Sequence, residues 1–369
     1  MTRAETVIVG GGPAGSATAS GLAALGRDVM LIERTAKPHN KVCGEFLSFE
    51  TQTQLQRLGV DPSSLGAVPV EQLALYSSSR SVTSALPFRA LSLSRYRLDD
   101  ALLQCAQNSG ARLKRNVAVK SVTPAGTGWN VLCDEGEIIY CRHLVLATGK
   151  LGLRGVDDAR DGSLVGLKMH LRLSPAARRA LEGRVELFFL DDGYIGLELI
   201  EDGIANLCFV LSRATVARLG SGWPALHACL ASALPSLTER LAGAEPLWDK
   251  PLAVVCPTGG HLHRERGIAI YRVGDRLAHI PPVHRRRPRH RARIRCAGGR
   301  APSARPPARR LSSSGAATHR HSHPAGEHRL RPRQEQRRTQ LNVRGSGLRA
   351  RPDRDYRPAN PANARRGGF

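Results

Sequence analysis

The chain has 369 residues, 41% of them hydrophobic, which is enough for one large or two medium-sized domains with a substantial core. Its formal net charge of +24 would point to nucleic-acid binding if it were evenly spread, but residues 284–369 hold 24 arginines, no lysine and four acidic residues. Residues 1–283 therefore carry a net charge of only +4. The basic character belongs to the tail, and we expect no specific nucleic-acid partner.

The eight cysteines form no C-x-x-C pair and no zinc-like spacing with histidine, so we expect thiols in a reducing compartment and no metal site. The N-terminal apolar run lacks a basic leader and a cleavage site, and no segment approaches the roughly 20 apolar residues that a transmembrane helix needs. We therefore expect a cytoplasmic protein without a transmembrane segment, for which peripheral membrane contact stays open.

The first fifty residues predict a β-α-β unit. Thr6 to Val9 is a short β-branched run, Gly10 to Gly15 is a glycine turn, and Ser16 to Leu25 has helical spacing. Gly26 ends the helix, and "DVMLIE" is a second buried strand that closes on Glu33.

The glycines follow the pattern G-x-G-x-x-G, and each has a steric reason. Gly10 permits the tight turn, Gly12 lets a pyrophosphate approach the backbone, and Gly15 lets the helix pack closely on the strand. The N–H groups that open the helix face the phosphate. Glu33, about 20 residues on, is placed to bind the ribose hydroxyls. The segment predicts a dinucleotide site.

Later segments indicate which dinucleotide. They are "KPHNKVCGEFLS", "LSLSRYRLDDALLQCA", "HLVLATGKLGLRG" and "GIAIYRVGDRLAHIPP". In this order they resemble the two-domain FAD-dependent oxidoreductases that include p-hydroxybenzoate-type hydroxylases and geranylgeranyl reductases, with the geranylgeranyl reductase branch more similar. The resemblance implies an α/β (α+β two-domain) flavoprotein: a Rossmann-like FAD domain with a parallel sheet, an antiparallel-sheet substrate domain, and a disordered basic C-terminal tail.

The resemblance also implies which residues contact FAD. Glycines of the first turn would cradle the pyrophosphate, Arg95 would open a helix with its guanidinium toward the ribityl or phosphate side, and Asp275 would accept a hydrogen bond from a ribityl hydroxyl. Cys43 lies in a loop expected near the flavin, although a buried small hydrophobe is an equal alternative. The full set is Gly10, Gly12, Pro13, Ala14, Gly15, Glu33, Arg34, Lys41, Cys43, Gly44, Arg95, Ala147, Thr148, Gly149, Gly274 and Asp275.

The middle of the chain predicts the substrate domain. Three alternating apolar runs in "VELFFLDDGYIGLELIEDGIANLCFVLSR" are separated by acid-glycine turns, which indicates an antiparallel meander. Ser221 to Leu241 predicts a helix broken near Pro235. The expected boundaries are 1–80, 95–155 and 263–282 for the FAD domain, 81–94 and 156–262 for the substrate domain, and 283–369 for the tail.

Two enzyme functions compete, and no side chain stands out as a general acid or base. One is reduction of C=C bonds in a small apolar isoprenoid- or polyketide-like substrate, with reduced FAD as hydride donor. The other is hydroxylation that depends on NAD(P)H and O2. Thr148-Gly149-Lys150, in place of the hydroxylases' Asp-Gly pair, favours the first. NAD(P)H is a candidate electron donor in both, and the oligomeric state stays open.

The tail raises a third alternative. The resembled proteins continue after "IPP" with a segment like F-T-G-D-G-[LM]-x-I-A-L. Here the residues from Val283 are "VHRRRPRHRARIRC", and codons for these residues, read one nucleotide later, can encode F-T-G-D-G-L-A-I-A-L-G-F-A. A reading-frame change at about Pro282 would therefore explain the tail. The chain as written would then be an inactive flavoprotein whose arginine-rich tail binds polyanions without specificity.

Overall fold

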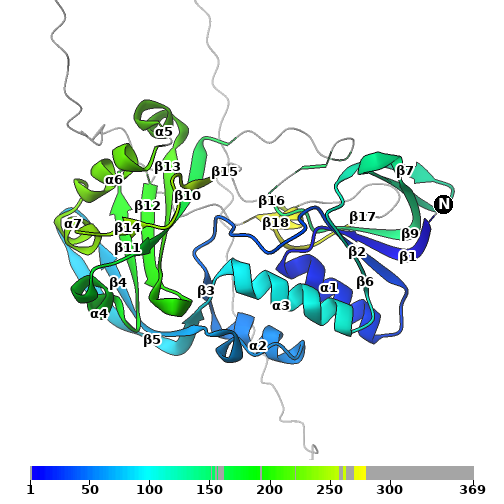
Figure 1. Cartoon of the computed structure of the whole chain (residues 1–369), viewed down its shortest axis with the longest axis horizontal. Coiled ribbons are helices and arrows are strands. Elements are labelled where there is room, and N and C mark those ends of the chain that lie inside the picture. Colours follow the sequence, from blue (N-terminus) through cyan, green and yellow to red (C-terminus); the bar gives the residue numbers. More distant parts are fainter. Residues whose placement is uncertain are drawn as a thin grey trace, which may run out of the picture. The chain divides into compact units, whose positions relative to one another are not determined.

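The fold is described from a computed structural model, which covers residues 2–150, 152–153, 156, 162–191, 193–220, 222–256, 261–262 and 270–279. The predicted disordered tail, residues 283–369, lies outside these residues. Figure 1 shows the two sheets and the helices that accompany them.

The first sheet is mainly parallel and contains the predicted β-α-β unit. Its strand order is β6-β2-β1-β9-β8-β7. Strand β17 lies off this path and pairs with β9 as well. The register of β1 with β2 and β9 is parallel, whereas β8 pairs antiparallel with β7 and β9. The strands are β1 Thr2–Val9, β2 Val29–Glu33, β6 Arg112–Arg115, β7 Val119–Ala125, β8 Gly128–Cys133, β9 Ile138–Leu146 and β17 Ile270–Arg272.

Two helices cover one face of this sheet. Helices α1 (Pro13–Ala24) and α3 (Arg95–Asn108) lie side by side (Figure 1), and both bury small or aliphatic residues against β1 and β2. The β7–β8 hairpin contributes Val122, Trp129 and Val131 to a separate core cluster of this sheet. Since β17 pairs in parallel with β9, the chain returns to the first sheet late in the sequence.

The second sheet is mainly antiparallel and contains the predicted meander. Its order is β14-β10-β13-β12-β11-β4-β5-β3, with β15 also paired to β10. Its strands are β3 Phe46–Leu47, β4 Val68–Tyr76, β5 Ser81–Ser92, β10 Leu164–Arg172, β11 Arg184–Leu190, β12 Gly193–Leu199, β13 Ala205–Ser212, β14 Glu245–Pro246 and β15 Leu252–Cys256.

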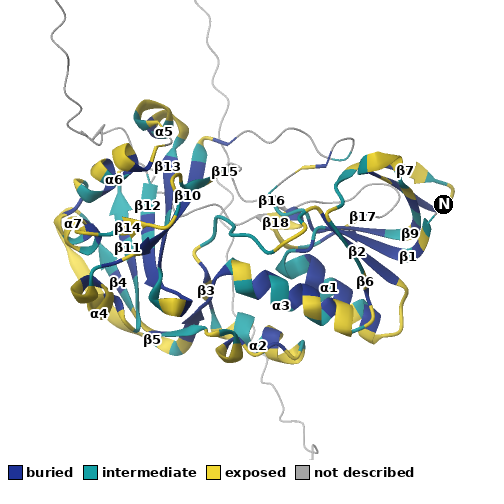
Figure 2. Ribbon diagram, in the orientation of Figure 1, coloured by how far each residue is buried: buried dark blue, intermediate teal, exposed yellow. Residues whose placement is uncertain are grey.

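One face of the second sheet forms the largest core. Aliphatic residues of β10, β12 and β13 pack there against helices α4, α6 and α7. Figure 2 shows the inner strands of both sheets in the colour of buried residues. The helices outside the first sheet's face are α2 Phe49–Arg57, α4 Pro175–Leu181, α5 Arg213–Leu219, α6 Trp223–Ala231 and α7 Pro235–Leu241.

Two details differ from, or refine, the sequence predictions. The FAD-domain segment predicted to span 1–80 already contributes β3 and β4 to the second sheet, because β3 pairs with β5, and β4 pairs with β5 and β11, rather than with the first sheet. The predicted 221–241 helix is two helices, since Pro235 begins α7 and cannot continue α6.

Short 3-10 turns complete the described fold: η1 Ser63–Leu65, η2 Asp134–Gly136, η3 Glu201–Gly203 and η4 Gly274–Arg276. The paired segments β16 His261–Leu262 and β18 Ala278–His279 form a two-stranded ribbon.

Candidate functional site

The glycine turn between β1 and α1 is built on close backbone approaches. Gly10 has φ +110°, and a Cβ there would lie 2.5 Å from the carbonyl oxygen of Ala147. A Cβ at Gly15 would lie 2.0 Å from the carbonyl oxygen of Gly10. Both positions therefore require glycine, one for the turn and one for helix-strand packing, as the sequence predicts.

The space in front of the turn is open to a ligand. Among the residues that the structure describes, a Cβ at Gly12 would meet only the Arg95 Nη2 atom, at 3.8 Å. Helix α1 begins at Pro13 and its N-cap makes no side-chain hydrogen bond. The opening N–H groups of α1 and the guanidinium of Arg95 thus face one region, which suits a phosphate group.

Glu33 is buried at the end of β2 and fixes the turn. Its Oε2 accepts a hydrogen bond from the Gly11 N–H at 2.8 Å, and its Oε1 accepts from the Thr35 N–H at 3.0 Å and the Thr35 Oγ1 at 2.8 Å. Burial opposes the charge, but these donors outweigh burial and lower the pKa of Glu33. Glu33 is therefore an ionised acceptor beside the glycine turn.

The cavity beside Glu33 is small, about 10 Å³, and is lined by the Lys37 to Lys41 segment together with Asp99 and Arg115. A space of this size holds about one water molecule. A nucleoside would therefore require side chains of that segment to move outward. Arg34, the next residue after Glu33, is exposed.

Asp99 is a residue of the site that the sequence reasoning left without a role. Its carboxylate accepts from the Arg95 Nε at 2.6 Å, from the Arg95 Nη2 at 2.8 Å and from the Lys41 Nζ at 2.7 Å. Burial opposes the charge of Arg95, but the hydrogen bonds to Asp99 and the negative charge of Asp99 raise the pKa of Arg95. The three side chains carry a net charge of +1 beside Gly12, which complements an anion. The i, i+4 spacing in the "RYRLD" motif is the signal that could have identified this pair.

Two distant segments complete the edge. Ala147 donates its N–H to the Val9 carbonyl at 2.8 Å, so the end of β9 lies against the glycine turn, and Thr148 and Gly149 follow it. Gly274 has φ +59°, and a Cβ there would lie 2.8 Å from the Ala14 Cβ. Asp275 in the same 3-10 turn is exposed. The structure thus brings the segments of the predicted residues together, while Arg34 and Asp275 expose their side chains.

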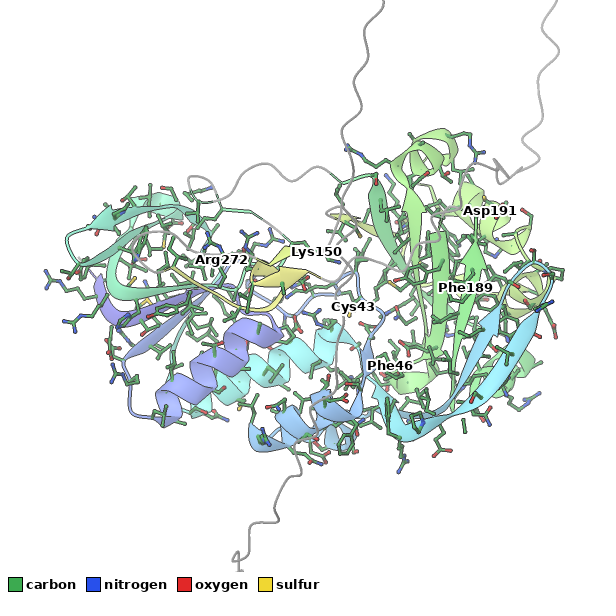
Figure 3. All side chains as sticks on the ribbon, turned by 180° about the vertical axis from the view of Figure 1, so that it is seen from behind. Cys43, Phe46, Lys150, Phe189, Asp191 and Arg272 are labelled. Carbon is green, nitrogen blue, oxygen red and sulfur yellow. The ribbon has the colours of Figure 1, made fainter. Side chains whose placement is uncertain are left out.

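The segment from Lys41 to Glu45 connects the two sheets. Figure 3 labels Cys43 on this segment and Phe46 at the start of β3, which follows it. Asn206 of β13 donates from Nδ2 to the carbonyl oxygens of Cys43, at 3.2 Å, and Gly44, at 3.0 Å. The Arg95 backbone N–H donates to the Glu45 Oε1 at 2.7 Å. The predicted FAD-proximal loop is therefore held by the second sheet and by the start of α3.

Glu45 is the strained centre of this segment. It has φ +62°, in the left-handed region that costs about 1–2 kcal/mol for a residue with a Cβ. Its fully buried carboxylate pairs with Lys168, and the His170 Nε2 donates to it at 3.1 Å. Burial opposes ionisation, but His170, Lys168 and the Arg95 N–H outweigh it and lower the pKa of Glu45. Strain of this kind persists only where the surroundings impose it.

Glu198 of β12 completes a buried group of four ionisable side chains, which we call the quartet: Glu45, Lys168, His170 and Glu198. The Ser92 Oγ donates to the Glu198 Oε2 at 2.7 Å. Burial, reinforced by the charge of Glu45, raises the pKa of Glu198 to about 8 despite the hydrogen bonds that it accepts. Sequence reasoning missed the quartet because its members come from separate strands.

The strand register shows what lies beside the quartet. In one row across the sheet, Val185 pairs with Glu198, Glu198 with Asn206, and Asn206 with His170. The same face continues over β11 and β4 with side chains that are only partly buried. These are Leu73, Leu75, Val185, Leu187, Phe189 and Tyr194. Figure 3 labels Phe189 on this sheet. The face is therefore apolar over β4 and β11 and polar at β12, β13 and β10.

Comparisons with known proteins agree with this arrangement. The family described as "FAD binding domain" matches residues 3–152. Menaquinone reductase of Mycolicibacterium smegmatis is 27% identical over 222 residues, covering 53% of this chain and 54% of that protein. Menaquinone reductase of Mycobacterium tuberculosis is 30% identical over 221 residues, with the same coverage. The chain thus spans about half the length of these relatives.

Solved structures extend the likeness to the fold. The myxobacterial chondrochloren halogenase, an FAD-dependent halogenase, has a TM-score of 0.64 at 22% identity, covering 77% of this chain and 70% of the other. A flavoprotein/dehydrogenase from Cytophaga hutchinsonii has a TM-score of 0.64 at 16% identity, covering 76% and 73%. Among the described residues, no helix is long and apolar enough to cross a membrane. The chain has the predicted two-sheet fold, which it shares with these flavin-dependent proteins, and residues 3–152 match the FAD binding domain family, which supports FAD as the cofactor.

Proposed function

We propose that the chain is an FAD-dependent oxidoreductase that reduces C=C bonds of an apolar, isoprenoid- or polyketide-like substrate. The observation that carries the proposal is the second sheet's exposed face. It offers partly buried aliphatic and aromatic side chains next to the segment of Cys43 and Gly44, which is tied to both sheets. Apolar lining with a few polar groups at one end is the usual composition of a small-molecule site.

The residues around the glycine turn fit FAD. Gly12 leaves room for a pyrophosphate, and the opening N–H groups of α1, Arg95 and Lys41 supply donors and positive charge. Glu33 is an ionised acceptor for the ribose. When bound and reduced, FAD supplies the hydride for one carbon of the double bond, and a proton completes the other carbon. The chain's task is to orient the substrate on the second sheet and to exclude water.

The relatives support the substrate class. Two of them are menaquinone reductases, and menaquinone is a quinone that carries an isoprenoid chain. The likeness of the "KVCGEFLS" and "ATGK" segments to geranylgeranyl reductases points the same way. We therefore favour a substrate with a polar ring or head and an apolar isoprenoid-like tail. The peripheral membrane contact left open by the sequence would suit such a substrate.

The test is anaerobic. The purified chain is loaded with FAD, reduced with NADH, NADPH or dithionite, and mixed with a short-chain prenylated quinone. The expected result is substrate-dependent reoxidation of the flavin and, by mass spectrometry, a product that has gained two hydrogens on the side chain. Reoxidation with no change in the side chain would contradict C=C reduction and leave reduction of the quinone ring.

The second candidate is an NAD(P)H- and O2-dependent monooxygenase. The FAD-dependent halogenases with the same fold favour it, although that likeness concerns the fold alone. Thr148-Gly149-Lys150 at the end of β9 favours the reductase. Oxygen consumption that depends on an aromatic substrate, measured after reduction of the bound FAD by NAD(P)H, would support the monooxygenase.

We further propose that the chain as written departs from its relatives by a reading-frame change at about Pro282. The reading of Val283 to Cys296 one nucleotide later supports this, because codons for these residues can encode the F-T-G-D-G segment in register. The nucleotide sequence around the Pro282 codon tests it. A verified, uninterrupted frame together with tail peptides in mass spectra would overturn it. If the frame change is real, the frame-restored chain should retain FAD more tightly than the chain as written.

A further inference from the structure

Gly196 lies at the centre of the second sheet's exposed face. In one row across the sheet, Leu187 of β11 pairs with Gly196 of β12, and Gly196 pairs with Cys208 of β13. Tyr194 and Glu198 lie two residues to either side of Gly196 and project to the same face, because side chains alternate along a strand. Gly196 itself is partly exposed. A position without a side chain therefore separates the apolar half of this face from the polar half.

Steric contacts within the described residues do not explain this glycine. Glycine occurs in the described strands at Gly128, Gly166, Gly193 and Gly196. A Cβ would lie 2.2 Å from a carbonyl oxygen at Gly128, 1.8 Å from one at Gly193 and 3.2 Å from a side-chain carbon at Gly166. At Gly196 the two nearest described atoms would lie at 3.5 Å and 3.6 Å, which are ordinary van der Waals distances. Its φ is not positive either, so an alanine would fit this position.

A strand glycine with no steric cause points to something that lies outside the strand. Glycine inside a strand is less favourable than alanine, since its unfolded chain has more freedom to lose. Such a glycine often marks a place where a ligand approaches the backbone closely. Leu187 and Tyr194 are partly buried and offer apolar and aromatic contacts to a ring. Glu198 offers a carboxyl group, which the Ser92 Oγ holds by a hydrogen bond of 2.7 Å.

This position is also close to the segment that the family resemblance places beside the flavin. Glu198, two residues from Gly196, pairs with Asn206. Asn206 donates to the carbonyl oxygens of Cys43 and Gly44. Two residues along a strand span about 7 Å. A ring over Gly196 would therefore lie beside the Cys43–Gly44 segment.

We propose that Gly196 determines substrate specificity: a planar ring of the substrate lies over the Gly196 backbone, and the apolar tail extends over β11 and β4. A side chain at this position would lift the ring from the sheet, because a flat and rigid group cannot bend around it. A flexible isoprenoid chain without a ring can shift toward Leu187 and Leu75 instead. Ring binding here rests on the proposed function, in which the substrate occupies this face.

Binding rather than turnover tests the proposal, on the full chain with FAD in excess. Titration calorimetry compares a short-chain prenylated quinone with geraniol, an isoprenoid alcohol that has no ring. In Gly196→Ala the quinone should bind about tenfold more weakly, and in Gly196→Leu about 100-fold more weakly. Geraniol binding should change by less than about threefold in Gly196→Ala. Gly21→Ala, which adds a methyl group on the exposed side of α1, is the matched control and should leave both affinities unchanged.

The stability of Gly196→Ala separates a ligand role from a structural role. This variant should have a urea midpoint equal to or above that of the wild type and should bind FAD with unchanged affinity, because no described atom crowds its Cβ. A lower midpoint would show that the strand itself needs glycine. Weaker FAD binding would place the flavin, rather than the substrate, over this residue. Either result would overturn the proposal.

The quinone affinities also distinguish the role of Gly196 from the proposed function. Equal quinone affinity in wild type and Gly196→Leu, or equal weakening of both probes, would show that no ring lies over Gly196. A wild type that binds no quinone would overturn both the ring position and the proposed substrate class. Quinone binding that depends on residue 196, without reduction of the side chain, would support the ring position and contradict C=C reduction alone.

Discussion

Glu33 and Glu198 are both buried glutamates on β-strands, yet their surroundings shift the two pKa values in opposite directions. Glu33 at the edge of the first sheet receives three hydrogen bonds, from Gly11 and Thr35, and its pKa is lowered. Glu198 inside the second sheet is opposed by deeper burial and by the negative Glu45, and the hydrogen bonds from Ser92 and Asn206 do not offset them, so its pKa is raised to about 8. Burial opposes ionisation of both carboxyls, and the local donors outweigh it at Glu33 but not at Glu198.

The two settings also differ in what the carboxyl does. Glu33 as an anion holds the Gly11 N–H in the turn and remains an acceptor for a ribose. Glu198, with its raised pKa, resists ionisation inside the second sheet. Each of the following substitutions changes the region around one of the two glutamates and leaves the region around the other unchanged.

The largest effect is expected from Gly15→Ala, which breaks the turn that orients the Gly11 N–H. The new Cβ would lie 2.0 Å from the Gly10 carbonyl oxygen, a contact between backbone atoms that cannot be relieved by a rotamer change. We expect a loss of more than about 4 kcal/mol in the free energy of unfolding and no retained FAD, measured by urea denaturation and by flavin absorbance. Gly21→Ala in the same helix is the control. A Cβ there meets nothing within 4 Å, so this variant should gain about 0.5–1 kcal/mol.

The second effect is expected from Asp99→Asn, which removes the anion between Arg95 and Lys41. Both cations would then remain without their buried partner, at a cost of about 3 kcal/mol, and FAD affinity should fall. Asp100→Asn is the control, because Asp100 is 44% exposed and pairs with Arg115 at the surface. Its cost should stay below about 1 kcal/mol. Equal losses in the two variants, measured by urea denaturation, would show that the Asp99 pairs are no stronger than a surface pair.

The third effect is expected from Glu33→Gln, which tests the ionised setting. Replacing the anion weakens its charge-assisted hydrogen bonds and should cost about 2 kcal/mol at pH 7. Because the folded-state pKa of Glu33 is lowered, its contribution is present above about pH 4.5 and is lost as the pH falls further. The gap between wild type and variant in urea midpoint should therefore close toward acid pH. A gap that is constant from pH 7 to pH 3 would show that Glu33 is not an ionised acceptor.

The first setting could be predicted from the sequence because its residues are close together along the chain. The spacing of Gly10, Gly12, Gly15 and Glu33 follows from one strand-turn-helix-strand unit, and the structure has each element within a few residues of its predicted place. The meander was also predictable, since the Asp-Gly turns lie between runs of strong strand residues. Sequence patterns therefore predict an arrangement well when the residues that contact one another are close together along the chain.

The quartet could not be predicted in that way. Lys168 and Glu198 are brought onto one face by the antiparallel pairing of β13 with β10 and β12, and Glu45 reaches Lys168 from the segment that precedes β3. Each of these residues, taken alone, reads as a surface charge. Long-range pairing also explains why the predicted 1–80 boundary lies too late, because nothing within β4 itself distinguishes a strand of one sheet from a strand of the other.

The smallest effect on stability is expected from Glu198→Gln near pH 4.5. The pH dependence of this variant should also differ most clearly from that of Glu33→Gln. Near pH 4.5 a neutral amide replaces a neutral acid, and the change should stay within about 1 kcal/mol. The folded-state pKa of Glu198 is raised, so its contribution is complete below the ordinary value of about 4.5 and is lost as the pH rises to about 8. The reason is that the unfolded chain ionises Glu198 freely over that range, whereas the folded chain does not. The variant lacks this loss and should become the more stable protein by pH 8, measured as urea midpoints across the range.

Glu186→Gln, which removes an ion-paired carboxylate from the same sheet, should be less stable than wild type at both pH values. If Glu198→Gln instead behaves like Glu33→Gln, with a deficit that grows as the pH rises, the two glutamates share one setting and the contrast between them is wrong.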